Sequence, residues 1–284
     1  ALIPAWLYQG LGQLKKFALY TLLVNLCYLV FVVSFIRAPA DYLSVTLGQG
    51  VIWISLYSVA LLQIVYPLRK YIRFSWKGAV GELKKGFPIF LTNFFHFLFV
   101  SSNIVILGFF VTGKELDNYS YAEKIYMVFR VISGVVYQMA YPKVFLLKQE
   151  SEKAADSFLL KLLLAILLVF GVVSGVLFWQ SEMIIELFTG KTNAEASELL
   201  GILSFSTLVY ALSVPFSQKI LVFYNNKIFS FILLLVVVFN IALNFYSVPL
   251  YGAKGTAITL LLTEIFFLTL SGVYVFIAKN QPSK

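Results

Sequence analysis

The sequence predicts an all-α, polytopic membrane protein. Of its 284 residues, 60% are hydrophobic and only 12% are charged, a balance that is typical of integral membrane proteins. The apolar residues come in blocks of about twenty, the length that a helix needs to cross a hydrocarbon core of roughly 30 Å. These blocks are continuously apolar and do not alternate with polar positions, which argues against a transmembrane β-barrel.

Eight such blocks follow one another along the chain, and each predicts one transmembrane helix. Helices are required because every backbone amide inside lipid must find its partner within its own segment. The fourth block differs from the others, since Glu123, Lys124 and Arg130 lie inside it. The predicted spans are residues 17–35, 43–66, 87–111, 119–142, 158–179, 197–221, 228–248 and 255–277.

The longest polar connection, residues 67–86, predicts how the chain is organised. It is basic and contains three glycines, so we expect two spans in residues 1–66, a cytoplasmic linker over 67–86, and six spans in residues 87–284. This connection has two possible structures. One is an amphipathic helix that lies on the anionic inner leaflet, and the other is a solvated linker. The apolar residues that would suit such a helix are Phe74, Trp76, Val80 and Leu83.

The basic residues predict the orientation in the membrane. The net charge is +9, and fourteen lysines and arginines lie in the connections on one side of the alternating spans. The other side has only four, namely Arg37, Lys114, Lys191 and Lys254. The positive-inside rule therefore places the fourteen, and both chain ends, in the cytoplasm. Because membrane topology accounts for the positive charge, we expect no nucleic-acid partner.

Arg130 lies near the middle of the fourth span and is the main candidate for function. An arginine at this depth costs from ~2.5 to above ~10 kcal/mol, so it needs a partner or a cavity. One interpretation is an ion pair with Glu264 or Glu123 that holds helices together. The other is a cavity cation whose fork of donors binds an anionic ligand such as a phosphate. Tyr126 lies on the same helical stripe as Glu123. Lys124 follows Glu123 and so points to a different side of the helix, nearer its outer end, where its long side chain can reach the membrane surface.

Other polar residues inside the spans give further candidates. Asn93, His96 and Asn103 lie within about 80° on the helical wheel of the third span. Their amide and imidazole groups suit sugar hydroxyls or a proton step, and interhelical hydrogen bonding is the alternative. Glu264 in the last span is either a coupling-ion or proton site or a neutral acid bonded to a neighbouring helix.

The sequence disfavours an enzyme, a metal site and a cofactor. No P-loop, HExxH or GxSxG motif is present, and these would indicate ATP hydrolysis, zinc proteolysis or a serine nucleophile. The single cysteine, Cys27, excludes a disulfide framework and a cysteine-based zinc site. The chain begins without a methionine and without a signal peptide, so we expect it to be a piece of a longer protein.

Several loose motifs occur in a persuasive order. They are PAWLYQG at the start, GFP with a later ILG in the third span, YSYAEKI in the fourth, FTG before the sixth, and NFYSVPLYGAKG before the last. In this order the chain resembles the lipid-linked oligosaccharide (O-antigen type) flippases. These form the polysaccharide biosynthesis branch of the multidrug/oligosaccharidyl-lipid/polysaccharide exporter superfamily.

The resemblance implies twelve spans in two six-helix lobes, of which this chain is the C-terminal two thirds. It implies a transporter in the bacterial cytoplasmic membrane that flips undecaprenyl-diphosphate-linked oligosaccharide units for O-antigen, capsule or exopolysaccharide assembly. Its partners would be the lipid-linked glycan, the bilayer, and a polymerase with other assembly proteins. The substrate-binding candidates are Arg130, Lys124, His96, Asn93, Asn103 and Tyr126, and the candidates for coupling or an ion pair are Glu264 and Glu123.

Two alternatives of different kinds remain. A multidrug or cation antiporter of the same superfamily would carry several carboxylates in its cavity. A membrane enzyme or polymerase of the polysaccharide pathway would carry a large non-cytoplasmic loop with clustered Arg, His or Asp.

The predicted topology is testable by thiol labelling in intact cells. Single cysteines that replace Lys77 and Lys148 should resist an impermeant reagent, and one that replaces Lys114 should react, because the positive-inside rule places them on opposite sides. Labelling of the cysteine at position 77 from outside would reverse the orientation.

Overall fold

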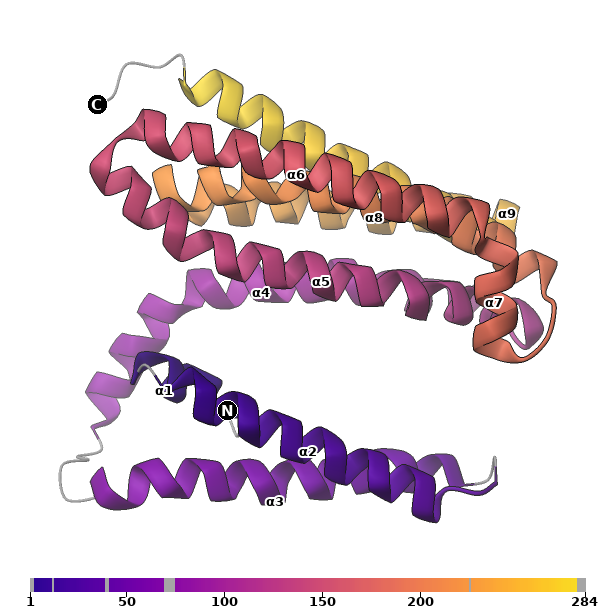
Figure 1. Ribbon diagram of the computed structural model, residues 1–284, viewed down its shortest axis with the longest axis horizontal. Helices are drawn as coiled ribbons and strands as arrows, with labels where there is room; N and C mark the ends of the chain where they lie inside the picture. The colour runs from indigo at the N-terminus through magenta and orange to yellow at the C-terminus, as the bar shows by residue number, and fades with distance from the viewer. Residues whose placement is uncertain (1–2, 12, 39–40, 69–74, 225, 280–284) are drawn as a thin grey trace. The chain divides into compact units, whose positions relative to one another are not determined.

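The computed structural model describes residues 3–11, 13–38, 41–68, 75–224 and 226–279. Within these ranges the regular structure is helical and no strand is present (Figure 1). The helices are α1 (Ala5–Gly10), α2 (Leu14–Phe35), α3 (Tyr42–Leu68), α4 (Trp76–Phe110), α5 (Lys114–Glu150), α6 (Glu152–Trp179), α7 (Ser181–Thr189), α8 (Ala194–Phe223) and α9 (Asn226–Lys279). The prediction of an all-α protein is confirmed.

Six helical segments are long and apolar enough to cross a membrane, by length and composition, among the residues described. They are Lys15–Phe35, Tyr42–Pro67, Phe90–Phe110, Glu152–Trp179, Ala194–Phe223 and Lys227–Ala278. The predicted count of eight spans is therefore not confirmed. The predicted fourth span lies in α5, whose polar side chains, Arg130 among them, lower its hydropathy. The last segment has 52 residues and contains both of the predicted final spans.

The chain divides into two compact units, Ala1–Gly81 and Glu82–Lys284. The boundary falls inside α4, which begins at Trp76 and runs on without a break. The part of the predicted linker from residue 76 to residue 86 is therefore helical. Its apolar side chains Trp76, Val80 and Leu83 are all exposed, whereas Phe74 lies outside the described residues.

In the first unit, helices α2 and α3 pack against each other, and α1 packs against α2. The hydroxyl of Tyr8 donates to the carbonyl of Ala60 at 2.9 Å, and the rings of Phe17 and Tyr57 stack at 6.1 Å. Most of the other apolar side chains on these helices are exposed, as expected for surfaces that face lipid.

In the second unit, α8 is the central helix and contacts α5, α6, α7 and α9. Figure 1 shows α5, α6, α8 and α9 running side by side, with the short α7 at one end of this bundle. The core includes Leu200 and Leu203 of α8 and Leu260 of α9, all at most 2% exposed. This bundle positions the candidate site.

Helix α9 is interrupted at Gly252, where φ is 54° and ψ is −133°. This backbone conformation is essentially restricted to glycine. Glu115 in the first turn of α5 accepts a hydrogen bond from the backbone N–H of Ala253 at 2.8 Å. Its carboxylate therefore caps the helix that follows the interruption, where the positive end of the helix dipole favours an anion.

We expect Gly252→Ala to destabilise the protein. The positive φ costs a side chain about 1–3 kcal/mol, and a Cβ at this position would collide with the Glu115 carboxylate. Thermal unfolding in detergent should show a lower Tm than wild type. The matched control is Gly175→Ala in α6, where the added Cβ meets open space, and an equal Tm for the two variants would contradict this explanation.

Candidate functional site

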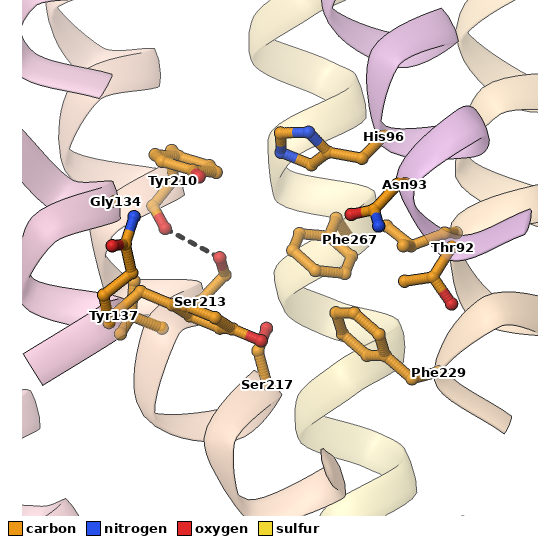
Figure 2. Close-up of a pocket in the computed structure, with 13 residues that line it drawn as sticks. Thr92, Asn93, His96, Gly134, Tyr137, Tyr210, Ser213, Ser217, Phe229 and Phe267 are labelled. Carbon is orange, nitrogen blue, oxygen red and sulfur yellow. Dashed lines mark hydrogen bonds between the residues drawn. The ribbon is translucent and has the colours of Figure 1, made fainter. Parts of the chain in front are cut away.

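A cavity of about 330 Å³ lies in the second unit among α4, α5, α8 and α9 (Figure 2). Its wall combines hydroxyl, amide and imidazole groups with aromatic rings, and none of the residues that line it carries a carboxylate, an amine or a guanidinium. They are Thr92, Asn93, His96, Gly134, Tyr137, Gln138, Tyr210, Ser213, Val214, Ser217, Phe229, Leu233 and Phe267. Neutral hydrogen-bonding groups beside aromatic faces suit a polyhydroxylated ligand.

Two of the predicted residues line this cavity. Asn93 and His96 are three positions apart, so α4 presents both on one side. Figure 2 shows them extending from α4 across the cavity from Tyr210 and Tyr137, with Phe267 of α9 near His96. Both side chains are exposed to the cavity or its opening.

Arg130 lies one turn before Gly134 on α5 and is 6% exposed. Its Nη1 donates to Glu264 Oε1 at 2.6 Å and to the Tyr126 hydroxyl at 2.6 Å. The Tyr126 hydroxyl in turn donates to Glu264 Oε1 at 3.1 Å. Of the two predicted partners for the guanidinium, the structure places Glu264 beside it, and this carboxylate is fully buried.

Aromatic rings surround the rest of the guanidinium. The Arg130 Cζ lies 4.1 Å from the ring centroid of Tyr210, which lines the cavity, and 5.0 Å from that of Phe99. Cation–π contacts of this kind stabilise a charge that has left water. Arg130 therefore lies directly behind a residue of the cavity wall.

The ion pair is incompletely satisfied. Arg130 Nε and Nη2 and Glu264 Oε2 are buried without a hydrogen-bond partner among the described residues. Buried polar atoms in this condition are uncommon and cost about 1–3 kcal/mol each. Arg130 is thus hydrogen-bonded through one nitrogen, and its other two nitrogens have no partner among the described residues.

Asn103 does not line the cavity and instead joins a buried amide network. Its Oδ1 accepts from Asn240 Nδ2 at 3.1 Å and from Asn244 Nδ2 at 2.9 Å. Asn240 Nδ2 also donates to the Thr263 hydroxyl at 3.1 Å. Since Thr263 precedes Glu264, the network ties α4 and both parts of α9 together beside the ion pair.

The other two predicted residues lie on different sides of α5. Glu123 is buried, at 8% exposure, whereas Lys124 is exposed. No ion pair joins Glu123 to Arg130 in the described part of the chain. Lys124 therefore lies away from the cavity wall, and Tyr126 acts as the hydrogen-bonding neighbour of Arg130 and Glu264.

Sequence reasoning missed two features of α8. Lys219 is 4% exposed and pairs with Glu152 at 2.9 Å and Asp156 at 2.5 Å; the spacing of these acids, one turn apart at the start of α6, was an available signal. The cavity residues Tyr210, Ser213 and Ser217 were also missed. Their spacing of three and four is a polar stripe within an apolar helix.

The comparisons with known proteins agree with one another. A family described as "Polysaccharide biosynthesis protein" matches residues 7–198. A Shigella dysenteriae protein named "Putative O-antigen transporter" is 25% identical over 272 residues, which is 93% of this chain and 67% of that protein. An Escherichia coli protein of the same name is 23% identical over 287 residues, 98% of this chain and 67% of that protein. No solved structure matches the chain.

We expect strong coupling between Arg130 and Glu264 in a double-mutant cycle of stability. Arg130→Met and Glu264→Met should each be destabilising by about 3–5 kcal/mol, because each leaves one buried charge uncompensated. The double variant should recover most of that loss, since no charge then remains buried. Thermal unfolding in detergent measures the cycle, and additive effects would show that the pair does not interact.

Proposed function

Because this chain belongs to the polysaccharide biosynthesis protein family, we propose that it is part of a transporter that flips lipid-linked oligosaccharide across the bacterial cytoplasmic membrane. The substrate would be an undecaprenyl-diphosphate-linked repeat unit for O-antigen, capsule or exopolysaccharide assembly. The names of the relatives in Shigella and Escherichia coli support transport in this pathway. The segments of membrane-spanning length support a location in the bilayer.

The observation that carries the proposal is the half-satisfied Arg130 beside a neutral cavity. Its Nε and Nη2 lack partners among the described residues, and a guanidinium binds phosphate oxygens through such a fork of donors. The hydroxyl, amide and imidazole groups of the cavity wall suit the first sugar of the same substrate. In this mechanism Arg130 binds the diphosphate while Asn93 and His96 hydrogen-bond the sugar.

Glu264 gives the transporter a means of coupling. When the diphosphate binds the Arg130 guanidinium in place of Glu264, the buried Glu264 carboxylate loses its partner. A lone charge in this environment is costly, so Glu264 then binds a proton or another cation. Return of Arg130 to Glu264 releases that ion and resets the site.

A multidrug or cation antiporter is the less favoured candidate. A cationic drug requires carboxylates in the cavity, and the residues that line it include none. The buried carboxylate of Glu264, whose partner Arg130 lies against the cavity residue Tyr210, is already paired.

We further propose that the chain crosses the membrane eight times. The interruption at Gly252 would separate two spans within α9, and α5 would cross with its arginine turned into the bundle. Both chain ends would then be cytoplasmic. The relatives extend beyond this chain, which aligns with 67% of each, and this suits a twelve-span protein in two lobes.

The decisive variant is the double substitution Arg130→Met with Glu264→Met in the full-length protein. It removes both charges and so avoids the buried lone charge that would unfold a single variant. We expect normal protein levels and Tm but at least about tenfold slower translocation of lipid-linked oligosaccharide into proteoliposomes, since a charged hydrogen bond contributes 1.5–3 kcal/mol. The control is Lys161→Met, which removes an exposed cation from α6. Wild-type translocation by the double variant would refute a role for the pair in transport.

A further inference from the structure

Two adjoining pockets lie at the end of the second unit where α5 begins. Their volumes are about 470 and 410 Å³. Both are lined by Lys114, Asn118 and Glu195, so they share a wall. Their other residues come from the first turns of α5 and α8, from the end of α7 and the connection that follows it, and from the segment around Gly252 in α9. We call the two pockets together the polar basin.

The basin gathers most of the basic residues that the sequence places on the non-cytoplasmic side. Only four lysines and arginines belong to that side, and three of them, Lys114, Lys191 and Lys254, line the basin. The three are far apart in the sequence. Membrane topology depletes this side of positive charge, so their convergence requires a separate explanation.

A hydrogen-bonded centre fixes the basin wall. Asn118 is 1% exposed, and its Nδ2 donates to Glu195 Oε2 at 2.5 Å while its Oδ1 accepts from Asn193 Nδ2 at 2.7 Å. Asn193 Oδ1 in turn accepts from the backbone N–H of Ala196 at 3.2 Å. Each of these side chains is therefore held in one orientation by its neighbours, which is the preorganisation that ligand binding rewards.

The charges of the basin are mixed and nearly balanced. Glu198 pairs with Lys254 at 2.7 Å, and Glu115 caps the helix after Gly252. Lys114, Lys191 and Asp117 have exposed side chains. A free anion would meet four acids here and a free cation would meet three lysines, so neither is the natural occupant.

We propose that the polar basin is a carbohydrate-binding site that holds the oligosaccharide part of the substrate on the non-cytoplasmic side. This inference rests on the proposed function. Closely spaced ammonium, amide and carboxylate groups match the alternating donors and acceptors of sugar hydroxyls. Tyr121 lines one pocket and Tyr251 the other, and each adds an aromatic face. Two pockets joined through one wall fit a chain of sugars better than a small ion.

The basin and the cavity lined by Asn93 and His96 would then bind different parts of the same substrate. Arg130 and the neutral cavity would bind the diphosphate and the first sugar within the membrane. The basin would bind later sugars after they emerge, which would favour release on that side and retain the glycan near the assembly proteins.

The test is direct binding of a lipid-free glycan to the full-length protein in nanodiscs. The probe is the oligosaccharide that mild acid releases from the host's own lipid-linked intermediates, measured by saturation-transfer NMR. The variant Lys114→Gln with Asp117→Asn should weaken binding by at least about tenfold, because it removes two charged hydrogen-bonding groups. Lys191→Gln, which changes an exposed side chain in the connection before α8, should also weaken binding.

The matched control is Arg37→Gln, a basic residue of the same predicted side that belongs to the first unit; its affinity should equal that of wild type. Undiminished binding by the Lys114 and Asp117 variant would overturn the proposal. Displacement of the glycan by inorganic pyrophosphate in the Arg130→Met, Glu264→Met variant, which lacks the proposed diphosphate site, would instead identify an anion site in the basin and also overturn the proposal.

This outcome is separable from the test of Arg130 and Glu264. If their double variant blocks translocation while the basin variants bind glycan normally, the transporter proposal stands and the basin proposal fails. If basin variants lose binding while the Arg130 and Glu264 variant translocates normally, the basin proposal stands and the proposed role of the ion pair in transport fails.

Discussion

The ion pair between Arg130 and Glu264 imposes the strictest constraint on the second unit. A guanidinium and a carboxylate that are both buried must meet, because either one alone would be strongly destabilising. Their 2.6 Å contact joins α5 to the last part of α9, across 134 positions of sequence. The amide network of Asn103 and Asn240 then ties α4 to the same region. Apolar packing around α8 completes the bundle but does not by itself fix which faces of α5 and α9 meet.

Stability alone does not explain why such a pair is present. Apolar residues of similar volume often stabilise a core as well as a buried ion pair does. The pair is also left half-satisfied, with two guanidinium nitrogens and one carboxylate oxygen lacking partners among the described residues. An arrangement that is costly and incomplete is typical of a functional site within a membrane. Its position behind Tyr210, in the wall of a neutral cavity, suits the proposed substrate, which has both charge and hydroxyl groups.

The sequence allowed several of these features to be predicted for physical reasons. Hydropathy indicated the helices, because lipid leaves the backbone little choice. The cost of a buried guanidinium identified Arg130, and helical spacing brought Asn93 and His96 to one side of α4. Helical spacing also grouped Asn103 with those two residues, although the structure places it in a separate network. A helical wheel gives the angle of a residue around the helix axis but not its position along that axis. Asn103 lies two turns beyond His96 on α4, which places it outside the cavity.

The remaining features depend on tertiary contacts that local patterns do not encode. Glu123 and Glu264 were equally acceptable partners for Arg130, and only the packing of α5 against α9 distinguishes them. At Gly252 the chain turns so that the two parts of α9 lie beside each other, with Asn240 bonded to Thr263. The carboxylate that caps the second part belongs to Glu115 of another helix, which no local pattern indicates. The polar basin was not anticipated, since its residues come from three distant segments whose convergence depends on the fold.

The central claim is that Arg130 exchanges Glu264 for the diphosphate of the substrate. Solid-state NMR can test this directly, with 15N-arginine-labelled full-length protein in lipid and undecaprenyl diphosphate as the ligand. Correlation between 15N and 31P should give a signal from the Arg130 guanidinium that disappears in the double variant Arg130→Met with Glu264→Met. A spectrum in which the bound diphosphate contacts other groups, and the Arg130 signal is unchanged by ligand, would contradict the account.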